Sequence, residues 1–280
     1  MTQWLRFWQH PILDKEFRER MRKRGTFWGI TIYLSVIGLI ALTYFFLASE
    51  MASSVVSGVG EYLIIGLFVI QLITLALVVP GVTAGVISGE RERQTLSILL
   101  TTPLSSSGIV IGKWLSSLSY ILLLVISSLP LYAIVYLYGG ISPSQLIKGF
   151  VHLFVSILFL GSLGIFASVV FKRTVVSTVV TYLAVAVVGI GSVILFGFWE
   201  VFKNINSIKN DLVSEILMGL NPLISLLTFL IDDFDHLSIQ PYAVYVTVYP
   251  CLTLLMLLLS IYFLSPLRWK MWSWPSRKKA

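Results

Sequence analysis

Side chains that could bind a metal or act in catalysis are few in this chain, and the densest group is acidic. Asp232, Asp233, Asp235 and His236 fall within one short stretch. Carboxylate oxygens so close together could hold a divalent cation. We favour a solvated acidic loop over a metal site, because such a cluster has no fixed geometry of its own.

Signatures of catalysis are otherwise absent from the sequence. Gly108–Lys113 reads GIVIGK, which is one residue short of a phosphate-binding loop and is followed by Trp114. No HExxH motif and no convincing order of Ser, His and Asp is present. His152 lies near the outer end of an apolar run, and we interpret it as a packed or interfacial histidine and not as a proton relay. The sequence therefore predicts no catalytic site and no means for this chain to use ATP itself.

A second group of charged residues has a pattern typical of binding. Residues 89–113 read GERERQTLSILLTTPLSSSGIVIGK, with alternating charges followed by leucines at Leu96, Leu99 and Leu100. The i, i+3, i+4 spacing puts those leucines on one face of a short helix. Pro103 ends the helix because proline disfavours helical geometry in the residue before it. Ser105–Ser107 can cap the helix that follows. We predict a surface helix at 89–104 that binds a soluble partner.

The elements around this segment are membrane spans. Hydrophobic residues make up 57% of the chain and charged residues 12%, with a mean hydropathy of +0.90. About 20 apolar residues in a helix cross a bilayer core. Six runs reach that length and contain no charged residue, so we predict an all-α membrane protein forming one domain over residues 1–280. The runs are Phe27–Leu47, Tyr62–Val86, Trp114–Tyr138, Phe150–Phe171, Thr174–Trp199 and Tyr242–Leu264.

Orientation follows from the basic residues, because cytoplasmic loops are enriched in Lys and Arg. If both ends are cytoplasmic, only Lys148, Lys203 and Lys209 of the 20 basic residues lie outside. The net charge of +7 then reflects topology and contact with anionic membrane lipid. We therefore expect no nucleic-acid partner.

Two segments outside the spans have their own patterns. Residues 11–24 place Leu13, Phe17 and Met21 at i, i+4 and i+8 among charges, which predicts an amphipathic helix in the cytoplasmic interface. Two interpretations stay open for it: a basic membrane anchor, or contact with a cytosolic partner. In the outer loop at 200–240, Asn221-Pro222 signals a turn. The apolar run Leu223–Ile231 that follows is too short to span, and we predict a re-entrant or surface helix there.

Three of these segments together resemble the permease subunits of ABC-2 transporters (type V exporter-like). The segment at 89–113 is similar to the cytoplasmic signature of that group, with its charged start followed by TL, LL, TP and GK. HPILDKEFRERMR, from His10, resembles the start of bacterial ABC-2 permeases. LNPL at Leu220–Leu223 is similar to the outer-loop NP of the group. Gln94 stands where many members carry glycine, and Ser97 where many carry a second acid.

The resemblance implies a six-span permease bundle that works with a separate ATPase subunit. ATP and Mg²⁺ would bind in that subunit, with no cofactor in this chain, and two permeases, identical or homologous, would form the assembly. The implied site residues fall into three sets: a coupling helix that docks the ATPase (Glu90, Arg91, Glu92, Arg93, Thr95, Leu96, Leu99, Leu100 and Pro103), a connecting helix (Leu13, Glu16, Phe17, Arg20 and Met21), and an outer gate (Asn221, Pro222 and Leu226).

The expected function is ATP-driven export of an amphipathic, lipid-like, peptide or drug cargo across a cell membrane, most simply the bacterial cytoplasmic membrane. One alternative is a mechanotransmission or sensing complex without bulk transport. Another is an intramembrane enzyme that uses His152, His236 and the aspartates, although the missing motifs argue against it. An ATPase encoded beside this chain would favour the two ATP-driven classes over the enzyme, and a neighbouring periplasmic or lipoprotein subunit would favour mechanotransmission over export.

Overall fold

The computed structural model describes residues 24–51, 59–96, 105–137, 141–206, 212–231 and 239–264, and in these ranges it contains helices and turns but no strand. Helices satisfy their own backbone hydrogen bonds, which hydrocarbon requires of any spanning segment. The helices are α3 (Arg24–Met51), α4 (Val59–Thr83), α5 (Ser88–Glu92), α7 (Ser106–Tyr136), α8 (Pro143–Val170), α9 (Thr174–Ala186), the π-helical turn η2 (Val187–Gly191), α10 (Ser192–Ile205), α11 (Leu212–Leu220), α12 (Pro222–Leu230) and α13 (Pro241–Leu264).

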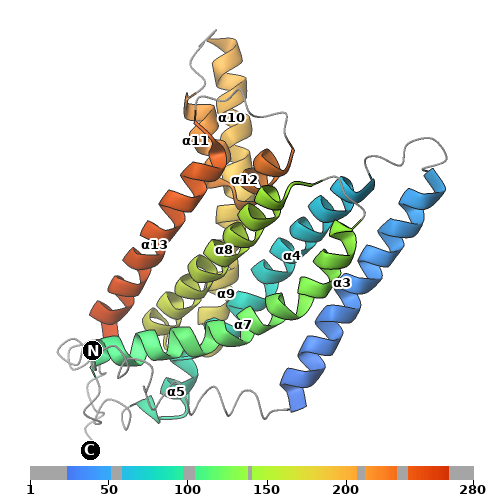
Figure 1. Ribbon diagram of the computed structural model, residues 1–280. Helices are drawn as coiled ribbons and strands as arrows, with labels where there is room; N and C mark the ends of the chain where they lie inside the picture. The colour runs from blue at the N-terminus through green and yellow to red at the C-terminus, as the bar shows by residue number, and fades with distance from the viewer. Residues whose placement is uncertain are drawn as a thin grey trace, which may run out of the picture.

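Five stretches of the described chain are long and apolar enough to cross a membrane, namely Gly60–Glu92, Ser106–Tyr136, Pro143–Val170, Thr174–Ile205 and Pro241–Leu264. The helix α3 adds 28 residues, or about 42 Å at 1.5 Å per residue. Figure 1 shows these elements running alternately up and down. The predicted all-α membrane bundle is confirmed.

Several helices differ in extent from the apolar runs that predict them. The helix α7 begins at Ser106, well before Trp114, and α8 begins at Pro143, well before Phe150. Their starts are fixed by local caps, because Ser105 accepts a hydrogen bond from the Gly108 amide, as predicted for these serines, and Ser142 forms a capping box with Gln145. Hydrophobicity marks the part of a helix inside the bilayer, whereas caps mark where the helix begins.

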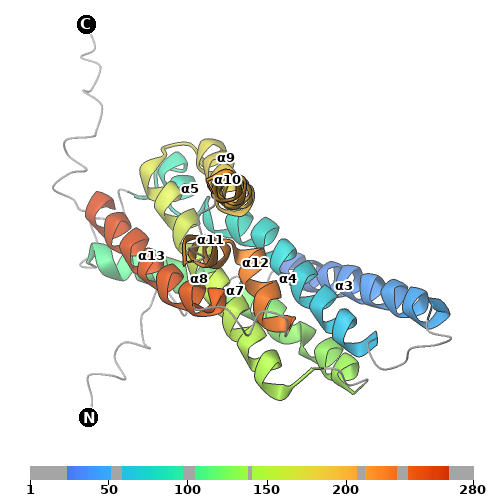
Figure 2. The same cartoon turned by 90° about the horizontal axis from the view of Figure 1, so that it is seen from above.

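The helix α8 is the most buried of the five spanning stretches and lies at the centre of the bundle. It packs against α4, α7, α9, α12 and α13, and Figure 2 shows it among them, with α3 at one edge. Glycines allow the closest contacts: a Cβ at Gly149 would collide with the ring of Phe68, and one at Gly164 would collide with Thr83. Small residues let membrane helices approach in this way.

The stretch Thr174–Ile205 is one long helix in which α9, the π turn η2 and α10 follow each other without a break. Most of its surface is exposed in this chain. A π turn inserts one extra residue into an α-helix and is often found at functional sites. No pattern in the sequence predicts η2.

The predicted short helix after Asn221-Pro222 is present as α12, and the sequence analysis missed its neighbour α11. The two helices meet at 109°, so they form a bent pair and not a straight span. We call the end of the bundle that carries this pair the bent-pair end, and the end that carries α5 the loop end. Both ends can be followed in Figure 1.

Candidate functional site

The charged segment predicted to bind a partner folds as a compact loop at the loop end. The helix α5 has five residues and ends in a turn in which Gln94 has φ of 60°. This left-handed conformation breaks the helix, and the Thr95 amide and hydroxyl both donate back to the Glu90 carbonyl, at 2.9 and 3.2 Å. The helix predicted over 89–104 is therefore interrupted at Gln94, where many family members carry glycine, which adopts positive φ without strain.

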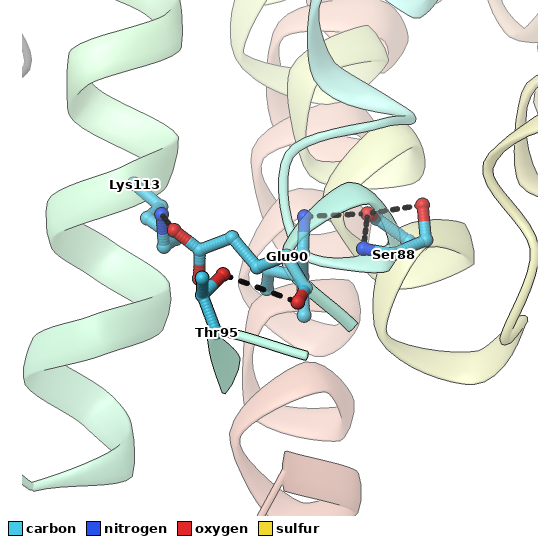
Figure 3. A network of polar contacts seen from close by, with 6 residues as sticks. Ser88, Glu90, Thr95 and Lys113 are labelled. Atoms are coloured by element: carbon cyan, nitrogen blue, oxygen red, sulfur yellow. Dashed lines mark hydrogen bonds and ion pairs between the residues drawn. The ribbon is translucent and has the colours of Figure 1, made fainter. Parts of the chain in front are cut away.

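Glu90 forms an ion pair with Lys113 of α7, with 2.6 Å between the carboxylate Oε1 and the ammonium Nζ. Figure 3 shows Glu90 reaching across to Lys113 while Thr95 folds back beneath it. The Lys113 side chain is 3% exposed and that of Glu90 29% exposed. A buried ammonium needs such a partner, because removing one member of a buried pair leaves an uncompensated charge. The pair fixes the loop to the beginning of α7.

The next two charges bind the ends of two neighbouring helices. The Arg91 guanidinium donates to the carbonyls of Val169 and Phe171, at 2.9 and 3.3 Å, where α8 ends. The Glu92 carboxylate accepts from the Thr174 amide at 2.9 Å and hydroxyl at 2.7 Å, where α9 begins. A helix carries partial negative charge at its C-terminus and partial positive charge at its N-terminus. The alternating charges thus match the polarity of α8 and α9.

Backbone contacts hold the same loop from beneath. The Ser168 hydroxyl of α8 accepts from the amides of Ile87 and Ser88, at 2.8 and 2.9 Å. These amides precede or begin α5 and have no partner within that helix. On the other side, the Ser177 hydroxyl of α9 donates to the Ala84 carbonyl at 2.7 Å. The loop is therefore bonded to α7, α8 and α9 by both side chains and backbone.

At the bent-pair end, Asn221 connects two elements that are distant in sequence. Its side-chain oxygen caps α12 by accepting from the amides of Leu223 and Ile224, at 2.8 and 2.9 Å. Its amide nitrogen donates to the Gly189 carbonyl in η2 at 2.7 Å and to the Ser192 hydroxyl of α10 at 2.8 Å. One side chain thus fixes the bend of the pair to the π turn of the long helix.

Two further side chains hold this bend against the bundle. The His152 ring of α8 donates from Nε2 to the Pro222 carbonyl at 2.9 Å and stacks on Tyr245, with 4.0 Å between ring centroids. The Tyr249 hydroxyl of α13 donates to the Leu220 carbonyl at 2.7 Å. His152 is buried in these contacts, as its apolar surroundings predicted.

Comparison with known proteins identifies the group to which this architecture belongs. A family model described as ABC-2 family transporter protein matches residues 10–271. The chain belongs to the ABC-2 transporter family. It is a multi-pass membrane protein and a transporter permease, and permeases of this family generally work with an ABC ATPase. A search of curated proteins found no match to the sequence.

The permease buries part of the surface that the sequence analysis assigned to docking. Leu96 is 1% exposed and lies in a small apolar cluster at the loop end. Leu96 therefore anchors the loop within its own chain and presents no side chain to a partner in this conformation. Arg93 is exposed, whereas Leu99, Leu100 and Pro103 lie outside the described residues. The cluster also contains Ile87, Ile109, Val110, Ile165, Val169, Leu257 and Leu264.

The predicted gate residue Leu226 of the permease is also internal. Its side chain is 0% exposed and belongs to the main apolar core. It packs inside its own chain, so it presents no side chain to a second copy in this conformation. Asn221 is buried as well, and its role as the bridge to η2 was not predicted.

The remaining predicted sites of the permease fall outside the described residues. These are the connecting helix with Leu13, Glu16, Phe17, Arg20 and Met21, and the acidic group from Asp232 to His236. Sequence analysis also missed three residues that hold the loop: Lys113, Ser168 and Thr174. Lys113 belongs to the GK of the family signature, which was the one available signal, whereas Ser168 and Thr174 have no distinguishing pattern.

Proposed function

We propose that this permease passes work from a separate ATPase to its membrane helices through the loop Ser88–Leu96. The observation that carries the proposal is the attachment of this loop to three helices at once. Glu90 binds α7, Arg91 binds the end of α8, and Glu92 binds the start of α9. A force applied to the loop is then shared by α7, α8 and α9, and no single flexible connection absorbs it.

Contacts at the other end support a route for that force across the bundle. The helix that begins at Thr174 continues through η2 to α10, and Asn221 joins η2 to the bent pair. The helix α8 contacts the loop through Ser168 and the bent pair through His152. Both routes are rigid helices of the kind that carries coupling between distant sites. We propose that the bent pair moves when the loop moves, and acts as the outer gate.

The orientation and the assembly are part of the same proposal. The distribution of basic residues favours an orientation in a cell membrane in which the loop end faces the cytoplasm. An ATPase with bound ATP and Mg²⁺ can reach the loop on that side. A second permease, identical or homologous, completes the assembly. The cargo that best fits apolar helices with few charges is amphipathic or lipid-like, and export is the direction we propose. Residues 11–24 would lie in the interface beside the ATPase.

We propose that the docking surface continues into Leu99 and Leu100, which follow the loop in the sequence, and a double substitution there tests docking. Apolar anchors dominate such contacts, often at about 2 kcal/mol or more each, while charges at the rim contribute less. Leu99→Ala with Leu100→Ala should release the ATPase or lower permease-stimulated ATP hydrolysis at least about tenfold. The assay is co-purification of the two subunits followed by ATP turnover in vesicles.

Two controls make this test specific. Leu183→Ala changes a leucine that is exposed on α9 and far from the loop, and it should leave co-purification and turnover unchanged. Leu96→Ala should lower the melting temperature of the permease, because Leu96 packs inside the chain. Normal binding and turnover by the Leu99/Leu100 double variant would place the docking site elsewhere.

A further inference from the structure

An apolar pocket of about 640 Å³ lies between the long helix and the rest of the bundle. Its walls come from α4, α8, the end of α9, η2, α10, the start of α12, and α13. The volume is within the range of about 300–1,000 Å³ that is typical of ligand sites in proteins. None of the residues in the loop Ser88–Leu96 lines it, whereas Asn221 and Tyr249 do, so the pocket is separate from the loop and adjoins the bend between α11 and α12.

The position of the pocket along the helices places it deep in the membrane. Leu72–Leu77 lie in the middle part of α4, Ser156–Leu160 in the middle of α8, and Val185–Val193 in the middle of the stretch Thr174–Ile205. The mouth faces sideways, because the most exposed lining residues are Leu77 on α4, 60% exposed, and Ile190 in η2, 64% exposed. Both side chains are apolar, so the mouth opens toward the hydrocarbon of the bilayer.

The polar side chains that line the pocket already have hydrogen-bond partners within the protein. The Ser156 hydroxyl bonds with the Tyr245 hydroxyl at 2.8 Å, and the Tyr249 hydroxyl donates to the Leu220 carbonyl. Asn221 uses its oxygen for the α12 cap and its nitrogen for Gly189 and Ser192. An occupant would therefore meet apolar surface and no polar group waiting for a partner. Ordered water needs two to four polar partners, and an apolar cavity does not supply them.

We propose that this pocket binds one hydrocarbon tail of a lipid from the surrounding bilayer. A tail that enters the pocket leaves hydrocarbon and not water, and hydrocarbon is about as apolar as leucine, so the hydrophobic effect contributes nothing. The driving force is instead dispersion between the tail and the pocket walls. An empty pocket would leave its walls without contacts on one side, and protein interiors do not tolerate large voids. The lipid headgroup stays at the membrane surface, since the pocket offers it no hydrogen bond. The tail lies against η2, the turn that Asn221 joins to the bent pair.

The test uses purified permease in phosphatidylcholine vesicles that contain a small fraction of phosphatidylcholine with a diazirine in the middle of one acyl chain. After illumination, cross-linked residues are mapped by mass spectrometry. Phe159 and Tyr249 line the pocket but are buried, so a lipid tail reaches them only by entering it. We expect label on both, in addition to the label that any exposed membrane residue such as Val179 acquires.

Variants that fill the pocket should remove that label. Ala186→Trp and Gly189→Leu both add bulk at lining positions, and a Cβ at Gly189 meets no other part of the bundle within 4 Å, so this position has space for a side chain. Label on Phe159 and Tyr249 should fall about fivefold or more, because a side chain that fills a packed site excludes another occupant. The matched control Leu183→Trp lies one turn away on the same helix, outside the pocket, and should change nothing. Label on Val179 reports correct insertion of every variant.

Two outcomes would overturn the proposal. One is label on Phe159 and Tyr249 that persists in both pocket variants. The other is absence of label on these residues in the unaltered permease, as expected if a helix of a second copy fills the pocket. The experiment needs neither the ATPase nor ATP, so its result does not depend on the proposed function.

Discussion

At the scale of single residues, the permease uses its signature charges first to build the loop that carries them. Glu90, Arg91 and Glu92 bind groups of their own chain. The ion pair with Lys113 is the most demanding of these contacts, because the ammonium is almost completely buried. Burial of an ion pair is costly, and the attraction between the partners offsets the cost only when both are present.

The pair therefore predicts unequal effects of single and double substitutions. Glu90→Gln removes the carboxylate that pairs with the buried Lys113 ammonium, and loss of one member of a buried pair typically costs roughly 3–5 kcal/mol. Adding Lys113→Met to that variant removes the buried positive charge as well and should restore part of the lost stability. Thermal unfolding of the purified permease measures the stability of the single and the double variant. Glu61→Gln, at the end of α4 away from the loop, is the charge control. A double variant no more stable than Glu90→Gln would show that the pair is not the source of the effect.

At the scale of elements, the long helix Thr174–Ile205 is the part that touches both ends of the bundle. It begins at the Glu92 carboxylate and meets Asn221 at η2. The Gly189 carbonyl that accepts from Asn221 lies in the π turn, whereas in a regular α-helix this carbonyl would accept a backbone amide of the same helix. The connection is short and fully hydrogen-bonded, so the bend of α11 and α12 should follow this helix.

Breaking the Asn221 bridge should uncouple the bent pair while leaving the ATPase bound. Asn221→Ala removes the α12 cap, worth about 1 kcal/mol, and also removes the hydrogen bonds to the Gly189 carbonyl and the Ser192 hydroxyl, worth about 0.5–1.5 kcal/mol each. Ser192→Ala removes one arm of the bridge and keeps the cap, so it should be milder. The measurement is permease-stimulated ATP turnover together with co-purification of the ATPase. Asn206→Ala, at the exposed end of α10, is the control. Loss of the ATPase itself in Asn221→Ala would contradict a role confined to the bent pair.

At the scale of the whole molecule, the helices alternate in direction, so the loop end and the bent-pair end lie on opposite sides of the bundle. Membership of the ABC-2 family assigns the chain to transporters, while the side that faces the cytoplasm is a prediction from the basic residues alone. An ATPase can reach only one side. The orientation thus decides whether Ser88–Leu96 can serve as its docking loop.

Cysteine accessibility tests the orientation in a background with Cys251 replaced by Ala. Cysteines at Ser144 and Asn206 should react with a membrane-impermeant maleimide added outside. Cysteines at Ser105 and Ser276 should react only after the membrane is opened, because they lie on the basic side. Reaction of the Ser105 cysteine from outside would show that the topology is the reverse of the predicted one and that the proposed docking site does not face the cytoplasm.

The sequence by itself determined the spanning helices of this permease and the turn into α12, because their signals are local. Long apolar runs specify spanning helices, serines before α7 specify its start, and Asn221-Pro222 specifies the turn into α12. Only the tertiary structure decided how these elements are joined. Lys113 is 23 residues from Glu90, and Thr174 is 82 residues from Glu92. No local pattern links positions so far apart, and an exposed charge and an internally paired one look the same in a sequence. Leu96 shows the same limit, since its stripe predicted an apolar face but not whether that face meets a partner or its own chain.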